Sequence, residues 1–144
     1  MEASDVETLG QLRRHRLDQA MRRLAVVEQA WRDAHDRSRA AVTALRDETE
    51  RALRAGEVGV LARWLEPAER RLQHMRAAFA ALSLSLAEAR SDVDRARLGV
   101  EQVDALRDQL TAVRKAARER REIANSDALA SRRRAAAWAA DLSW

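Results

Sequence analysis

Apolar residues recur in the first part of the chain at alternating spacings of three and four. The pattern passes through Leu17, Ala20, Leu24, Val27, Trp31, Ala34, Ser38, Ala41, Leu45, Glu48 and Ala52. Because 3.6 residues make one helical turn, these positions share one side of an α-helix. So long a regular seam is typical of a helix paired with one other helix in a coiled coil. The pattern predicts a first helix over about 4–54, with Ser4 or Asp5 capping its start.

A second seam of the same kind follows. It passes through Leu61, Leu65, Ala68, Leu72, Met75, Phe79, Leu82, Leu86, Ala89, Val93, Ala96, Val100 and Val103. An extra step of three then leads to Leu106, after which the seam resumes at Leu110, Val113 and Ala117. The seam predicts a second helix over about 61–134, followed by a tail at 135–144. The extra step overwinds a coiled coil locally, and Gly99 weakens a helix by roughly 1 kcal/mol, so we expect a bend near 99–106.

The stretch LRAGEVGVLARWLEPAERRL, residues 53–72, is the one interruption between the two seams. Gly56 and Gly59 predict a reversal at about 55–60, with a short helical turn after it and Pro67 at or near the first position of the main second helix. Each flank offers only one apolar stripe, and burying the stripes against each other is the simplest solution. We therefore predict an all-α fold, a single long antiparallel two-helix coiled-coil hairpin over 1–144, in which residue i faces approximately residue 114 minus i.

The two predicted helices differ in length. At about 1.5 Å per residue, the first would reach about 75 Å and the second about 105 Å, so the C-terminal helix should overhang from near residue 111. Within 114–134 the large apolar residues are only Ile123 and Leu129. Isolated helices are marginally stable in water, so we expect this overhang to fray or to dock on another protein.

Composition supports long amphipathic helices in one soluble unit. The 144 residues include no cysteine and no tyrosine, 35% are charged and only 3% are aromatic. No apolar run is long enough to span a bilayer, and the start MEASDVETLGQL has no signal-peptide pattern, so we expect a cytoplasmic location without membrane insertion.

The modest net charge of +4 conceals two basic stretches. Residues 114–134 carry eight positive and three negative side chains, and residues 11–23 carry five and one. A hairpin would bring these stretches together at its open end. Three interpretations of this end are a solvated helix face, a nucleic-acid patch and a surface that fits an acidic protein pocket; no stacking platform or known nucleic-acid-binding fold supports the second.

The candidate partner-binding residues are mostly basic. They are Arg13, Arg14, Arg16, Arg114, Lys115, Arg118, Arg120, Arg121, Arg132, Arg133 and Arg134, together with Trp64. Trp31 fits the seam, whereas Trp64 borders the turn and either staples the reversal or contacts a partner. Trp138 and Trp144 lie beyond the predicted seam and offer anchors for docking.

We find no catalytic, metal-binding or cofactor-binding pattern. His15, His35 and His74 lack the spacing of a metal site and are expected to be exposed on helices. The SDVD stretch at 91–94 lacks the glycine and final glutamate of a calcium loop, and Ser83 has no base beside it. The sequence therefore predicts a protein that is not an enzyme and carries no cofactor.

The chain resembles the FliJ and YscO family, with its Hrp-type counterparts, over most of its length. The resemblance rests on an early long helix, a mid-chain break containing Trp64 and Leu65, a longer second helix and a basic end. The segment EIANSDALASR, residues 122–132, is similar to the family's late acidic residue followed by an arginine, although Asp127 is followed by Ala128 where family members often have an acidic pair.

This resemblance implies a stalk component of a flagellar or type III secretion export apparatus, peripheral to the inner membrane. It would insert into a hexameric secretion ATPase, link that ATPase to the export gate protein and contact secretion chaperones. On this hypothesis the basic end meets the ATPase, and the hairpin body around Trp64 meets the gate or a chaperone. The alternatives are a structural or adaptor coiled coil, such as a homodimer of extended chains, and a basic coiled coil that binds nucleic acid.

Overall fold

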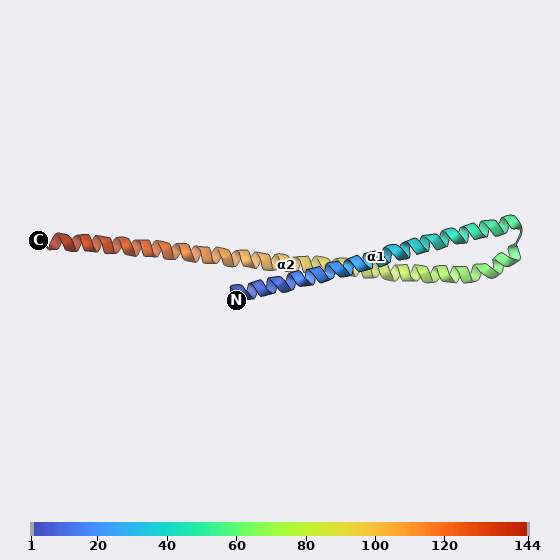
Figure 1. Ribbon diagram of the computed structural model, residues 1–144, viewed down its shortest axis with the longest axis horizontal. Helices are drawn as coiled ribbons and strands as arrows, with labels where there is room; N and C mark the ends of the chain where they lie inside the picture. Colours follow the sequence, from blue (N-terminus) through green and yellow to red (C-terminus); the bar gives the residue numbers. More distant parts are fainter. Residues whose placement is uncertain (1, 144) are drawn as a thin grey trace. The chain divides into compact units, whose positions relative to one another are not determined.

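The computed structural model describes residues 2–143, and within that range it contains two α-helices and no strand. Helix α1 spans Ala3–Ala55 and helix α2 spans Val58–Leu142. The helices run in opposite directions on either side of one short turn (Figure 1) and pack against each other. This arrangement confirms the predicted all-α helical hairpin.

The described residues form two compact units. Unit 2 comprises Leu12–Val100 and includes the turn. Unit 1 combines residues 2–11, of which 3–11 belong to α1, with residues 101–143, of which 101–142 belong to α2. Each unit therefore takes its residues from both helices, and each is described separately below.

Gly56 closes α1 and reverses the chain. Its φ of 70° is a left-handed conformation that side chains other than glycine's strongly disfavour. The Gly56 N–H donates to the Leu53 carbonyl at 3.3 Å, and the Glu57 N–H donates to the Ala52 carbonyl at 3.0 Å. This pair of bonds is the Schellman motif, which satisfies carbonyls at a helix end that would otherwise lack donors. The Glu57 carbonyl then accepts the Leu61 N–H at 3.0 Å, which starts α2.

Helix α2 is longer at both ends than predicted. It begins at Val58 rather than 61, so Gly59 is helical and Pro67 lies inside the helix instead of at its first position. At the other end, residues 135–142 continue the helix where the sequence analysis placed a tail, because alanine, the strongest helix former, dominates this stretch. The helix also continues without interruption through 99–106, and the bend expected there stays a prediction.

The two glycines near the turn provide a matched pair of substitutions. Gly56→Ala is expected to destabilise the chain by about 1–2 kcal/mol, because a Cβ is strained at positive φ. Gly59→Ala is expected to stabilise it by about 1 kcal/mol, since α2 is regular there and no atom lies within 4 Å of the added Cβ. Urea unfolding followed by circular dichroism measures both, and equal effects of the same sign would contradict this account of the turn.

Unit 2 has the predicted seam and register. Trp31 contacts Ser83, and Arg23 contacts Asp92. The residue numbers of these pairs add up to 114 and 115, in agreement with the expectation that residue i faces approximately residue 114 minus i. The predicted seam positions are buried or half-buried throughout this unit, except Glu48, which is exposed while the adjacent Thr49 turns inward. Its buried apolar core is formed by Leu86, Ala89 and Val93.

Unit 1 has a smaller core. Val6 of α1 and Val103 of α2 are 2% and 4% exposed. Beside them a Cβ at Gly10 would lie 3.2 Å from Nη2 of Arg107 and 3.4 Å from Cγ1 of Val103, so the glycine lets the two helices approach closely. Val113 of α2, a predicted seam position, is 61% exposed. It lies level with the first residues of α1, so little of α1 is available to cover it.

Candidate functional site

The C-terminal segment, defined as residues 115–142 of α2, is a helix without a partner in unit 1. The last place where α1 and α2 line a common surface is a groove of about 120 Å³. It is lined by Ala3, Val6, Glu7, Arg107, Leu110, Thr111 and Arg114. Beyond it Ala117 is half-buried, and every residue from 118 to 143 is exposed. An overhang was predicted from near residue 111, and the exposed helix begins only a few residues later.

The predicted basic residues of the C-terminal segment are all exposed, as is Arg114 immediately before it. Among the described residues, 2–143, these side chains form no ion pair. They form a single hydrogen bond, which Nε of Arg134 donates to the Ala130 carbonyl at 3.5 Å. The eight positive and three negative side chains of 114–134 therefore present an excess of cationic groups to solvent on a helix that contacts little else. Such a surface attracts anionic groups, and added salt weakens that attraction by screening the charges.

The three predicted arginines near the N-terminus have different environments in unit 2. Arg13 is half-buried and covers Gly99, where a Cβ would lie 3.2 Å from its Nη1 and 3.3 Å from its Cδ. Its Nε is buried and finds no hydrogen-bond partner among the described residues. Arg14 is exposed and already interacts with a neighbouring group. Arg13 therefore contributes to packing between the helices as well as to the basic surface.

Arg16 is exposed beside an open groove of about 430 Å³ in unit 2. The groove is lined by Arg13, Arg16, Ala20, Asp92, Arg95 and Ala96. Asp92 pairs with Arg95 at 3.3 Å and with Arg23 at 3.4 Å, so its carboxylate is shared between two guanidinium groups. The basic stretch at 11–23 thus lies mainly in unit 2 and the stretch at 114–134 in unit 1, and their predicted meeting at one end stays a prediction.

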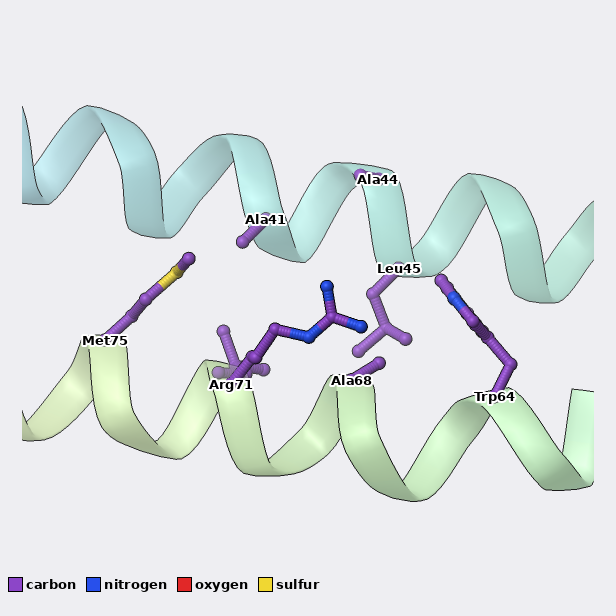
Figure 2. Close-up of a pocket in the computed structure, with 8 residues that line it drawn as sticks. Ala41, Ala44, Leu45, Trp64, Ala68, Arg71 and Met75 are labelled. Carbon is purple, nitrogen blue, oxygen red and sulfur yellow. The ribbon is translucent and has the colours of Figure 1, made fainter.

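Trp64 lies between two grooves near the turn. Figure 2 shows its ring extending from α2 toward α1 beside Leu45, with Met75 at the other end of a groove of about 160 Å³. Trp64 also lines a second groove of about 190 Å³, together with Glu57 and residues from both helices. Because its side chain is half-buried between the helices, Trp64 holds the two helices together near the reversal while leaving part of its ring accessible.

The seam contains an aromatic cluster that the sequence analysis predicted only in part. Trp31 is half-buried as expected and donates from Nε1 to the Ser83 hydroxyl at 3.0 Å. Its ring lies 5.4 Å from that of Phe79 and 5.5 Å from that of His35. The expectation that His35 is exposed is wrong, because it lies one helical turn after Trp31 and stacks on it.

Ser83 was not predicted to contact Trp31, although the rule that residue i faces 114 minus i pairs these two positions. His15 and His74 are exposed, as expected. Trp138 is 67% exposed, whereas Trp144 lies outside the described residues. Trp138 is thus the described tryptophan with the most surface available to a partner.

The described residues define a helical-hairpin protein with an exposed basic C-terminal segment and a half-buried tryptophan, Trp64, near its turn. Across residues 2–143, no group of three histidine or acidic side chains is placed to hold a metal ion. Neither helix contains an apolar stretch that would let it cross a membrane, within the same range. The chain matches no family model, no curated protein and no solved structure.

Proposed function

We propose that the chain is a non-enzymatic stalk component of a type III secretion export apparatus. In this role it links a hexameric secretion ATPase to the export gate protein and also contacts secretion chaperones. The observation that carries the proposal is the C-terminal segment, a basic helix exposed on all sides from residue 118 onward. A single helix with its side chains is about 10–12 Å across, which suits insertion into a narrow acidic socket.

The energetics of the segment favour a partner. A lone helix gains little from its own hydrogen bonds in water and usually depends on packing for stability. The rest of the hairpin already has such packing, since the seams of unit 2 are occupied by the chain's own helices. This also argues against a homodimer of extended chains, which would need these seams to open. We assign the C-terminal segment to the ATPase, and the surface around Trp64 to the gate or a chaperone.

The proposal is tested by crosslinking in the native cell and purifying the chain with its partners. A hexameric secretion ATPase should be recovered with the wild-type chain. Reversing the charge of Arg118, Arg120, Arg121 and Arg132 to glutamate should reduce that recovery by roughly tenfold or more, because attraction to an acidic socket becomes repulsion.

The control reverses four exposed arginines of unit 2 instead. These are Arg37, Arg39, Arg46 and Arg54. This variant has the same net charge as the first, so it should recover the ATPase as wild type does. Failure to recover any secretion ATPase with the wild-type chain overturns the proposed function, and full recovery with the first variant overturns the assignment of the segment.

A further inference from the structure

We infer that the C-terminal segment binds one side of an acidic partner helix and so extends the coiled coil beyond the end of α1. The inference rests on the proposed function in taking this segment as the surface that meets a partner. It goes further in naming the face of the helix, the residues on that face and the chemistry of the partner.

An apolar stripe continues along α2 after its contacts with α1 end. It consists of Val113, Ala117, Ala124, Ala128, Ser131, Ala135, Trp138 and Leu142. Most steps between them are three or four residues, and the one step of seven spans two helical turns, so all lie on one side of the helix. Arg120 lies on that side within the step of seven and interrupts the apolar stripe there. Val113, Trp138 and Leu142 are 61%, 67% and 63% exposed, so no described residue covers the large members of this stripe.

A row of arginines borders the apolar stripe on one edge. Arg114, Arg121 and Arg132 are separated by seven and eleven residues, spacings that return to nearly the same side of an α-helix. All three are exposed, and with residues 2–143 none forms an ion pair or hydrogen bond. In a coiled coil, charged residues beside the apolar seam pair with opposite charges on the facing helix and determine its identity.

The combination of stripe and edge identifies the occupant. The apolar stripe matches the seam of another helix, and its small residues allow close approach of the two backbones. The basic edge requires glutamate or aspartate along the facing side of that helix. A second copy of this segment is excluded by charge, because each copy carries eight positive and three negative side chains over 114–134 and the two copies would repel each other. Phosphate binding by a nucleic acid would leave the apolar stripe exposed.

The probe for this inference is a synthetic helix about four heptads long, with leucine in its seam and glutamate at the flanking positions. Binding to the full chain is measured by fluorescence anisotropy of the labelled peptide and by calorimetry. We expect binding that weakens with added salt, and none for the same peptide with lysine in place of glutamate. A Kd for the lysine peptide equal to that for the glutamate peptide would overturn the inference.

Two triple variants distinguish the edge from general positive charge. The first variant changes Arg114, Arg121 and Arg132 to glutamate. It should raise the Kd for the glutamate peptide roughly tenfold or more, since three attractive pairs become repulsive. The control changes Arg37, Arg39 and Arg46, three exposed arginines of unit 2, to glutamate and so alters the net charge equally. This control should shift the Kd by no more than about threefold. Equal weakening by both variants would overturn the assignment of binding to this edge.

A second pair of variants tests the stripe. Trp138→Ser should weaken binding, whereas Leu129→Ser, at an exposed residue on the opposite side of the helix, should not. Trp138 and Leu129 are both exposed, so thermal unfolding should stay unchanged in the two variants and binding losses cannot be attributed to misfolding.

The outcomes separate this inference from the proposed function. If the acidic peptide does not bind but the secretion ATPase is still recovered from cells, the inference fails and the proposed function stands. If the peptide binds with the expected selectivity and no ATPase is recovered, the proposed function fails while the binding face is retained. A doubled mass of the free chain that is abolished by the Arg114, Arg121 and Arg132 substitutions would instead identify a second copy as the occupant.

Discussion

Val93→Asp is expected to lower the free energy of unfolding by about 3–5 kcal/mol, among the largest effects of any single substitution in the chain. Val93 is 3% exposed and belongs to the core of unit 2 with Leu86 and Ala89. A carboxylate there would lose its hydration on burial in the apolar seam. Since small domains are stabilised by only about 5–15 kcal/mol, the variant should lose most of its helix at moderate temperature.

Urea unfolding followed by far-ultraviolet circular dichroism measures this loss. The matched control is Leu84→Asp, which introduces the same side chain on the same helix at a position that is 69% exposed. Its effect should stay within about 0.5 kcal/mol, as expected for a surface substitution. Similar destabilisation by the two variants would show that the seam assigned to α2 is incorrect.

Trp31→Ala is expected to destabilise the chain by about 3–5 kcal/mol, because it removes the largest side chain of the aromatic cluster and leaves a cavity. Trp31 packs on Phe79 and His35 and donates a hydrogen bond to Ser83. Trp31→Phe keeps much of the packing and removes the hydrogen bond, so it should cost less. The Ser83 hydroxyl still donates to the Phe79 carbonyl at 2.9 Å, which limits the cost of the lost bond to about 1 kcal/mol.

Trp138→Ala serves as the control for both variants, since Trp138 is 67% exposed and its loss leaves no cavity. The expected order of unfolding midpoints is wild type and Trp138→Ala together, then Trp31→Phe, then Trp31→Ala. An unfolding midpoint for Trp31→Ala equal to that of Trp138→Ala would exclude a packing role for the cluster.

The two seams predicted the two helices, and the reversal at Gly56 and Gly59 predicted their antiparallel pairing and an approximate register. The contact of Trp31 with Ser83 agrees with that register, because their residue numbers add up to 114. The boundaries of α2 were less predictable. Gly59 and Pro67 disfavour a helix by local propensity, yet one Schellman closure at Gly56 is sufficient to stop α1, and α2 starts immediately afterwards.

The exposure of the basic C-terminal segment was predictable from the unequal lengths of the two seams. The packing of Arg13 over Gly99 and of Arg107 beside Gly10 was not, because it depends on how long side chains lie across the facing helix. Sequence periodicity treats arginine as a polar outer residue, although its methylene groups cover apolar surface well. The same limitation affected His35, whose ring stacks on Trp31 at the border of the seam.

The chain reversal at Gly56 depends on main-chain hydrogen bonds and on a residue without a side chain. The nearby side chains of Leu53, Val58 and Val60 are 59%, 60% and 64% exposed, so they contribute little to holding the reversal in place. Their identity is consequently open to change at small thermodynamic cost, which makes this loop a suitable place for attaching a probe or grafting a recognition sequence.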